Sequence, residues 1–334
     1  MKKLRFALLA VAVAFAALSV VPSGSAAQEV SVNPTAKAVN EEALFRQLDK
    51  VTGRVSIPDQ TSGTLIQPEG RDWRTLHQQT IPQIGSYVLI GIISLLVVFF
   101  VIRGRVRVRR GFSGIKVLRF GSLDRFAHWF TAFSFIILGL TGLNIVFGKD
   151  LVLPLVGPEN FTLLSQWGKY AHNFLGIPFT IGIILMFLLW VKDNFPSSGD
   201  LAWIKAGGGL VGHGHVEAKR FNFGQKMVFW STILIGGALA ASGFILMFPF
   251  QGTTIAGMQL AQVIHSVGGI VLIAVIFAHI YIGSIGMEGA FDAMGSGKVD
   301  LNWAREHHSL WAETAPVVEG DKVSAPRGMP APAE

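Results

Sequence analysis

The sequence contains no cysteine, and this absence excludes several kinds of metal centre. Without thiols the chain alone can form no disulfide, no iron–sulfur cluster, no thiolate-ligated haem and no covalently attached c-type haem. A metal bound by this chain must therefore be held by histidine, methionine or carboxylate side chains, or within a porphyrin.

Charged residues are also scarce. They make up 15% of the 334 residues, whereas about a quarter is typical of soluble domains. Hydrophobic residues make up 51%, and the mean hydropathy is +0.49. The formal net charge is +7, but the basic residues gather between apolar segments. This pattern follows the positive-inside rule of membrane proteins better than it resembles a phosphate-binding face, so we expect no nucleic-acid partner.

Residues 1–27 have the features of a secretory signal peptide: a basic start, an apolar run over 6–21 and small residues at 24–27 for cleavage. The apolar run is slightly long for a cleaved signal, so an uncleaved anchor is the alternative. Either form places residues 28–83 outside the cytoplasm, where we expect a polar extension that rests on a partner.

Five apolar segments follow, each near the length of about 20 residues that a helix needs to cross a bilayer. They cover residues 84–102, 127–147, 172–191, 227–248 and 262–286. We therefore predict an all-α integral membrane protein, in which a four-helix transmembrane bundle within 103–312 is preceded by one additional transmembrane helix at 84–102. The tail, 313–334, has no periodic pattern and is predicted to be disordered. The chain shows no inverted repeat of the kind that transporters use.

Basic residues predict the orientation of these segments. A cationic run directly after the first segment marks the cytoplasmic side. This run consists of Arg103, Arg105, Arg107, Arg109, Arg110, Lys116 and Arg119. Segment 192–226 is also basic, whereas 249–261 carries no charge. We expect a multi-pass protein of the bacterial inner (plasma) membrane, with its N-terminus periplasmic after signal cleavage and its C-terminus cytoplasmic.

Four histidines, His128, His172, His265 and His279, lie in three of the last four apolar segments. An ionisable side chain within a bilayer is a functional-site hypothesis by default. The last two are fourteen positions apart, which in one helix is about 21 Å along the axis with both rings on nearly one face. The predicted topology places His172 level with His265 near the outer surface, and His128 level with His279 near the inner surface.

Two neutral imidazoles at one depth can ligate the two faces of a haem iron. Such ligation leaves no open position on the iron and suits electron transfer rather than oxygen chemistry. We therefore predict two b-type haems, an outer one on His172 and His265 and an inner one on His128 and His279. Two haems about 20 Å apart would carry electrons across most of the bilayer.

Other residues near the histidines have two interpretations. Glycines could let a flat macrocycle approach the helix backbone, or could serve helix packing; they are Gly139, Gly142, Gly176, Gly268 and Gly269. Arg125 and Lys169 each precede a histidine by three residues and are candidates to pair with haem propionates, or are ordinary interfacial cations. His307 and His308 are expected to be interfacial tail residues.

The residues around these histidines resemble the γ subunit, or cytochrome b subunit, of respiratory membrane-bound formate dehydrogenase. The matching pieces are Arg119-Phe120, Asp124 to Trp129, Tyr170 to His172, Arg220 to Lys226, and the helix of His265 and His279. The resemblance covers roughly residues 117–312. Residues 28–116 go beyond the short four-span form of that family and add one span.

The resemblance implies partners and an electron acceptor for anaerobic respiration. An α subunit with a molybdenum or tungsten pterin would oxidise formate outside, and an iron–sulfur β subunit would pass the electrons to the outer haem. The inner haem would reduce a quinone, menaquinone or ubiquinone, near the cytoplasmic face. The positions carried over for the quinone are Asn222, Gln225 and His279, although Asn222 has the alternative role of a helix N-cap.

Two other hypotheses remain at this point. The same haem pattern would serve the cytochrome b subunit of a nickel–iron hydrogenase or of a thiosulfate or polysulfide reductase. A haem-free anchor or transporter with pH-responsive histidines is an alternative of another class. The chain on its own shows no catalytic dyad or phosphate-binding loop, and the one reaction it could host is quinone reduction.

Overall fold

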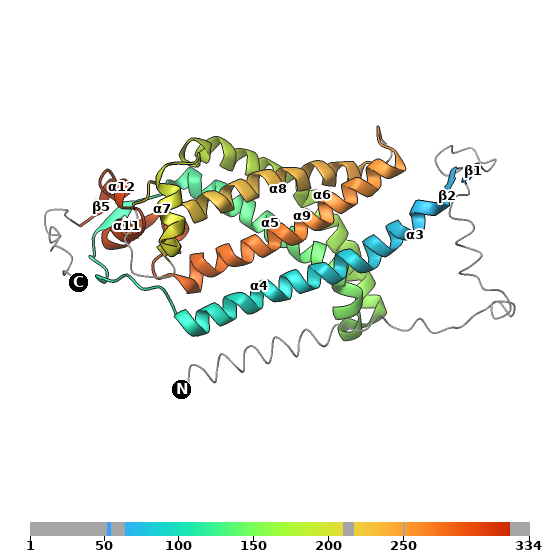
Figure 1. Ribbon diagram of the computed structural model, residues 1–334, viewed down its shortest axis with the longest axis horizontal. Coiled ribbons are helices and arrows are strands. Elements are labelled where there is room, and N and C mark those ends of the chain that lie inside the picture. Colours follow the sequence, from blue (N-terminus) through green and yellow to red (C-terminus); the bar gives the residue numbers. More distant parts are fainter. Residues whose placement is uncertain (1–51, 55–63, 210–216, 250, 321–334) are drawn as a thin grey trace.

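The computed structural model describes residues 52–54, 64–209, 217–249 and 251–320 (Figure 1). The predicted signal peptide, most of the extension 28–83 and the end of the tail lie outside these residues. The described part is mainly helical, and five of its helices are long and apolar enough to cross a membrane, which agrees with the predicted number of spans.

Each of the five long helices begins before the apolar segment that predicted it, because polar and interfacial residues form helical turns at its N-terminal end. They are α4 (Ile81–Arg103), α5 (Ser122–Leu151), α6 (Leu153–Trp190), α8 (Phe223–Met247) and α9 (Ile255–Tyr281). Helix α6 is much longer than its apolar segment; its regular geometry breaks at Gly157, where φ is 79°.

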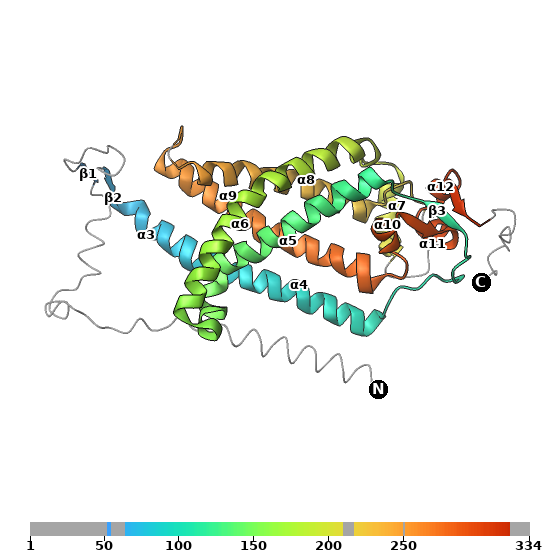
Figure 2. The same ribbon diagram turned by 180° about the vertical axis from the view of Figure 1, so that it is seen from behind.

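Helices α5, α6, α8 and α9 form the bundle, and α4 lies along its outside against α9 (Figures 1 and 2). The buried residues of α4 are Ile81, Gly85 and Leu89, spaced one turn apart on one face. A Cβ atom at Gly85 would lie 2.5 Å from Ile270 Cδ1 of α9, so the absence of a side chain there permits the close approach.

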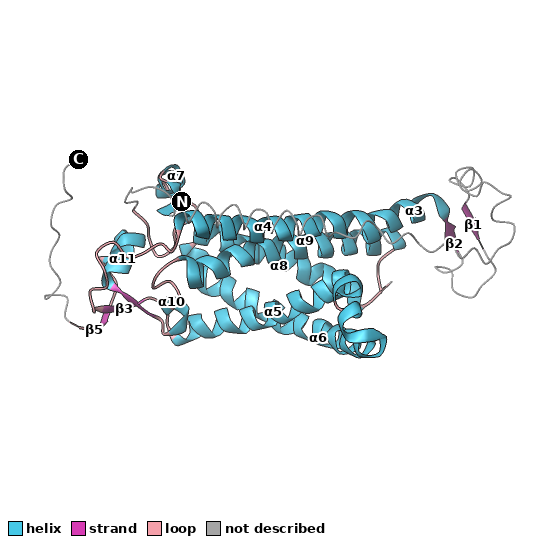
Figure 3. Cartoon of the chain, turned by 90° about the horizontal axis from the view of Figure 1, so that it is seen from below, coloured by secondary structure: helices cyan, strands magenta, loops and turns pink. Residues whose placement is uncertain are grey.

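Part of the predicted extension is regular structure. Strand β1 (Thr52–Arg54) pairs antiparallel with β2 (Thr64–Ile66). Helix α3 (Gln67–Thr75) and a π-helical turn, η1 (Leu76–Thr80), then lead directly into α4. Together, α3 and η1 continue the direction of α4 beyond the end of the bundle, as Figure 3 shows.

A three-stranded antiparallel sheet lies at the opposite end of the molecule from α3, and we call this end the sheet end (Figure 3). Its order is β4 (Lys298–Asp300), β3 (Lys116–Leu118), β5 (Val317–Glu319). The prediction of a disordered tail is therefore wrong for 313–320. The tail alone carries too few apolar residues to signal order, but β3 supplies a strand partner about 200 positions away in the sequence.

Short helices complete the sheet end. They are η2 (Val191–Asp193), α7 (Gly199–Lys205), η3 (Gly207–Gly209), η4 (Ile282–Gly286), α10 (Asp292–Gly295), α11 (Leu301–His307) and α12 (Ser309–Ala312). The best-buried apolar core of the described residues lies here, where Val117, Val299 and Ala304 are fully buried.

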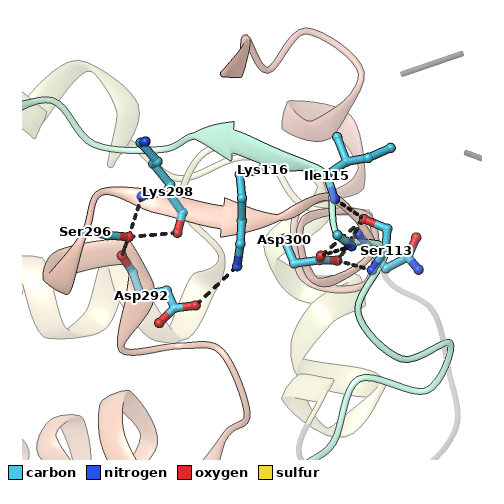
Figure 4. A network of polar contacts seen from close by, with 9 residues as sticks. Ser113, Ile115, Lys116, Asp292, Ser296, Lys298 and Asp300 are labelled. Atoms are coloured by element: carbon cyan, nitrogen blue, oxygen red, sulfur yellow. Dashed lines mark hydrogen bonds and ion pairs between the residues drawn. The ribbon is translucent and has the colours of Figure 1, made fainter. Parts of the chain in front are cut away.

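The carboxylate of Asp300, at the end of β4, binds the segment that leads into β3 (Figure 4). It is 2% exposed and accepts hydrogen bonds from the Ser113 N–H at 3.0 Å and the Gly114 N–H at 3.0 Å. It also accepts from the Ser113 hydroxyl and caps α11 through the Asn302 N–H at 2.8 Å. A buried acceptor that satisfies several backbone donors is costly to remove.

We predict that Asp300→Ala lowers the free energy of unfolding of the sheet end by about 2 kcal/mol, because three backbone donors, one of them in the first turn of α11, lose their partner. Asp292→Ala is the matched control, since its carboxylate is 45% exposed and lies 3.7 Å from Lys116; a surface pair of this kind contributes less than about 1 kcal/mol. Thermal unfolding and amide exchange of β3 and β4 in detergent would measure both. Equal effects of the two substitutions would contradict this view of Asp300.

Candidate functional site

The four histidines form two facing pairs inside the bundle. His172 of α6 and His265 of α9 have ring centroids 6.0 Å apart. His128 of α5 and His279 of α9 also have ring centroids 6.0 Å apart. These are the two pairings expected from the topology.

The two pairs lie at different depths because α9 supplies one member of each. This helix is continuous from Ile255 to Tyr281, so the rise of an α-helix separates His265 from His279 by about 21 Å. The His128–His279 pair, which we call the inner pair, lies toward the sheet end. The His172–His265 pair is called the outer pair.

Both imidazoles of the outer pair are hydrogen-bonded through Nδ1. His172 Nδ1 lies 2.8 Å from the Thr141 hydroxyl oxygen. His265 Nδ1 lies 3.1 Å from the Leu239 carbonyl oxygen and 3.1 Å from the Ser242 hydroxyl oxygen. A carbonyl can only accept, so Nδ1 of His265 carries the proton and its Nε2 has a free lone pair.

The inner pair has a different environment. The His128 ring meets the Trp129 indole edge to face, with centroids 5.1 Å apart. Its Nδ1 is buried and has no hydrogen-bond partner among the described residues. A buried, unsatisfied imidazole nitrogen is unusual in a folded protein and is a reason to look for a functional role of the ring.

The spacing of the rings fits a metal held between them. An imidazole nitrogen binds a transition-metal ion at about 2.0 Å, so two rings on opposite sides of one ion have centroids about 6 Å apart. Within the described ranges, no three histidine or acidic side chains gather closely enough to hold a bare ion. Each pair could supply two ligands to a metal ion, and a macrocycle would have to supply the others, as in a bis-imidazole haem.

Glycines border the histidines, and some of them leave space. Gly176 and Gly269 follow the outer histidines by one helical turn, Gly283 follows His279 in the same way, and a Cβ added at any of the three would meet nothing within 4 Å. A flat macrocycle can approach a helix backbone at such positions. Gly139 and Gly268 instead face isoleucine and leucine side chains, which is the packing role.

The model of the prokaryotic cytochrome b561 family matches residues 119–297, more than half of the chain. The chain belongs to this family. It is a membrane cytochrome b that serves electron transfer, and its family membership implies b-type haem as the cofactor.

Three curated relatives show how far the similarity extends. The cytochrome b556(fdo) subunit of formate dehydrogenase from Escherichia coli strain K12 is 31% identical over 199 residues, which cover 58% of this chain and 91% of the relative. The nitrate-inducible cytochrome b556(Fdn) subunit from the same strain is 29% identical over 213 residues, covering 62% and 95%. The cytochrome b556 subunit of formate dehydrogenase from Haemophilus influenzae is 27% identical over 204 residues, covering 59% and 82%.

The two cations predicted to pair with propionates differ in their surroundings. Arg125 of this cytochrome is held at the sheet end, where its Nη1 donates to the Gly295 carbonyl at 2.8 Å and its Nε is buried without a partner among the described residues. Lys169 is exposed on α6, one turn before His172. Of the two, only Arg125 has a buried donor left for an anionic group.

The two amides predicted to bind a quinone form the N-cap of α8. The Asn222 side-chain oxygen accepts from the Gln225 N–H at 3.0 Å, and the Gln225 side-chain oxygen accepts from the Asn222 N–H at 3.2 Å. This reciprocal capping box uses both side-chain oxygens. A hydrogen bond from either residue to a quinone carbonyl would therefore have to come from the amide NH₂ group.

Sequence reasoning missed a buried cationic cluster at the sheet end. Arg119 is 3% exposed and stacks with the rings of Phe120, Trp303 and Trp311 at 5.0–5.4 Å. Its Nη2 donates to the Arg220 carbonyl at 2.8 Å and lies 3.0 Å from His308 Nε2. Burial and the neighbouring charge of Arg220 lower the pKa of Arg119 to about 9.

His308 is a core residue, so the expectation of an interfacial tail position is wrong. It is 1% exposed, and its Nδ1 lies 2.9 Å from the Lys219 carbonyl. Burial and the positive charge of Arg119 hold the pKa of His308 well below its ordinary value. The local sequence does not predict the burial of His308, because the residues that bury it come from segments about 90 and 190 positions away.

Ion pairs fix the helix ends around this cluster. Arg220 binds Asp193 at 2.8 Å and Asp124 at 3.3 Å, and Asp124 also accepts from the Trp190 indole at 2.6 Å. Lys226 is 4% exposed and pairs with Asp200 at 2.8 Å. Burial alone would raise the pKa of Asp200, but hydrogen bonds from Lys226 and from the Ser197 N–H and hydroxyl give a net lowering.

We predict that the sheet end loosens in acid because of His308. A histidine whose pKa is lowered by folding contributes stability that is complete above the free pKa of about 6.5 and is lost as the pH falls below it. The fluorescence of Trp303 and Trp311, followed from pH 7.5 to 5, should report the change.

The matched variant is His308→Gln, in which the amide can accept from Arg119 and donate to Lys219 without titrating. We expect His308→Gln to flatten the pH profile. Arg119 stays positively charged over this range and contributes no titration of its own. An unchanged profile in His308→Gln would show that another group is responsible.

Proposed function

We propose that this cytochrome is the membrane subunit of a formate dehydrogenase, in which it holds two b haems and passes electrons to the quinone pool. The observation that carries the proposal is the presence of two facing histidine pairs at two depths along α9. The names of the relatives from E. coli and H. influenzae support formate as the source of electrons.

The proposed ligands of the outer haem are His172 and His265, and those of the inner haem are His128 and His279. When bound, each haem would supply a one-electron carrier with both axial positions filled. The chain's own contribution is to hold two imidazoles on opposite sides of each iron and to surround them with apolar helices that exclude water.

We further propose that the sheet end faces the cytoplasm. Seven basic residues between Arg103 and Arg119 lie on the connection into this end, and cations next to a span favour the cytoplasmic side. The N-terminal extension and the outer pair would then face the periplasm of a bacterial inner membrane. The proposed partners there are an iron–sulfur β subunit and an α subunit with a molybdenum or tungsten pterin.

The proposed quinone position is next to the inner pair, with His279, Asn222 and Gln225 as its candidate contacts. The two amides are fixed by the α8 cap, so their NH₂ groups have defined directions. Arg125, with its buried free Nε, is the stronger propionate candidate, and Lys169 is the candidate for the outer haem.

The haem ligands can be tested one pair at a time. We predict that the wild-type protein gives a b-type reduced-minus-oxidised spectrum with two haems per chain. His265→Ala should reduce this to one haem, because the outer iron loses a ligand while the inner pair is about 21 Å away along α9. His128→Ala should remove the inner haem alone, and His77→Ala, in the extension, should remove none.

The pyridine haemochromogen assay and a potentiometric titration would measure haem content and identify which redox wave is missing. A colourless wild-type protein expressed with ample haem would contradict the proposal and favour the haem-free anchor. Loss of both haems in every histidine variant would contradict the separation into two independent sites.

The electron donor needs a separate experiment. We expect the tagged chain to co-purify from membranes with an iron–sulfur protein and a pterin-containing protein, and formate to reduce its haems within the intact complex. Hydrogen gas is the control donor. Reduction by hydrogen but not formate, with hydrogenase subunits in the preparation, would assign the chain to a hydrogenase instead.

A further inference from the structure

The bundle consists of two hairpins, α5–α6 and α8–α9, whose first helices have identical residues at several equivalent positions. Several residues in α5 and directly before it recur 101 positions later in α8 and directly before it. The matching pairs are Arg119 with Arg220, Phe120 with Phe221, Trp129 with Trp230, Thr131 with Thr232, Leu138 with Leu239, and Gly142 with Gly243.

The hydrogen bonds at the helix starts follow the same register. The Gly121 N–H donates to the Asp124 carboxylate at 3.0 Å, and at the equivalent place the Asn222 N–H donates to Gln225 at 3.2 Å. About two turns further in, Thr131 and Thr232 each donate to the carbonyl four residues before, at 2.7 and 2.8 Å. Both halves thus begin with the same local structure.

The two hairpins, α5–α6 and α8–α9, also run in the same direction, each starting and ending at the sheet end (Figures 1 and 3). A parallel repeat of this kind is related by a two-fold axis along the helices. The axis exchanges α5 with α8 and α6 with α9, so it exchanges His172 with His265. The outer pair therefore lies across the axis, with its midpoint on it.

Each outer histidine meets the same set of groups. On α5, the Thr141 hydroxyl donates to the Ile137 carbonyl at 2.7 Å and lies 2.8 Å from His172 Nδ1. On α8, the Ser242 hydroxyl donates to the Ala238 carbonyl at 2.7 Å and lies 3.1 Å from His265 Nδ1.

The neighbouring backbone repeats as well. The Leu138 carbonyl lies 3.1 Å from the Thr141 hydroxyl, as the Leu239 carbonyl lies 3.2 Å from the Ser242 hydroxyl. A Cβ at Gly142 would lie 3.4 Å from His172 Cε1, and one at Gly243 would lie 3.2 Å from His265 Cε1.

Counting the available protons shows which atom donates and which accepts in each hydrogen bond between a hydroxyl and an imidazole. A hydroxyl has one proton, and in Thr141 and Ser242 that proton is used by a backbone carbonyl. Each hydroxyl oxygen is therefore left to accept, and the donor facing it is the Nδ1–H of the imidazole. This fixes the tautomer and leaves the Nε2 lone pair available on both rings.

We propose that Thr141 and Ser242 are equivalent positioning residues of an internal two-fold repeat, each holding the Nδ1–H of one outer imidazole so that both Nε2 atoms face one shared iron. The proposal rests on the proposed function, because it takes the iron to be that of the outer haem. A group that accepts from Nδ1–H also makes Nε2 a stronger electron donor, which stabilises the ferric state.

The repeat also accounts for the absence of a symmetric partner to the inner pair. The positions equivalent to His128 and His279 are Phe229 of α8 and Met186 of α6, and both are in the buried core of the sheet end. Helices α6 and α8 pack closely, whereas α5 and α9, which carry the inner histidines, touch only lightly. One side of the axis is thus filled by side chains, and the proposed inner haem would lie on the other side.

The test uses the full-length cytochrome with its haems bound. Ser242→Ala and Thr141→Val each remove one acceptor, and Ser242→Thr and Thr141→Ser restore it. We expect each removal to shift the midpoint potential of one haem upward and to weaken its retention by about tenfold, the lower end of the effect of outer partners on metal sites. Because the two residues are equivalent, the two shifts should be similar in size.

Two hydroxyls that touch no histidine serve as controls. Ser134→Ala on α5 and Thr232→Val on α8 remove hydroxyls that donate only to backbone carbonyls, and neither should move either potential. If the wild-type protein holds two haems but Ser242→Ala and Thr141→Val behave like these controls, the positioning role is overturned while the haem proposal stands. A wild-type protein without haem would overturn the proposed function itself.

If Ser242→Ala or Thr141→Val fails to fold, the conservative variants Ser242→Thr and Thr141→Ser provide the test. The low-spin ferric electron paramagnetic resonance signal of the outer haem responds to the electron donation of its axial imidazoles. It should be retained in Ser242→Thr and Thr141→Ser. A loss of this signal in both conservative variants, with haem still bound, would show that a hydroxyl at these positions is not what sets the ligand state.

Discussion

The site depends on one geometric constraint. At each of two depths in the bundle, two imidazoles from different helices must face each other. Helix α9 satisfies it by crossing the bundle without a break and presenting His265 and His279 on one face. Helices α5 and α6 run antiparallel to each other, and each brings one further ring whose centroid lies 6.0 Å from that of its partner on α9. Any change in the register of α9 would move both pairs at once.

The sheet end gives the helices a fixed register. Three strands distant in sequence, a buried Arg119 between aromatic rings, and the Arg220–Asp124 pair tie together the ends of α5, α6, α8 and α9. These contacts lie outside the apolar spans, where directional hydrogen bonds and close packing can set a register. Within the spans, by contrast, hydrophobic burial in lipid cannot choose between neighbouring registers, because lipid and protein are equally apolar.

The sequence was sufficient for the features that depend on local pattern. Hydropathy predicted five spans, and topology alone predicted which histidines would face each other. It failed where distant segments decide the structure: the order of 313–320 depends on a strand partner at Val117, and the burial of His308 depends on Arg119 and Lys219. Asn222 and Gln225 carry both a cap and a proposed quinone role, and the pattern could not separate the two. Thr141 and Ser242 are visible in the sequence only once the two hairpins are aligned.

The central claim is that each facing pair of imidazoles holds one iron porphyrin. A cryo-electron-microscopy map of the purified membrane complex tests it most directly. The account predicts two planar densities, one between His172 and His265 and one between His128 and His279, with each iron bonded to Nε2 of both rings. Ring pairs in direct contact with no density between them, or a macrocycle bound elsewhere, would contradict it.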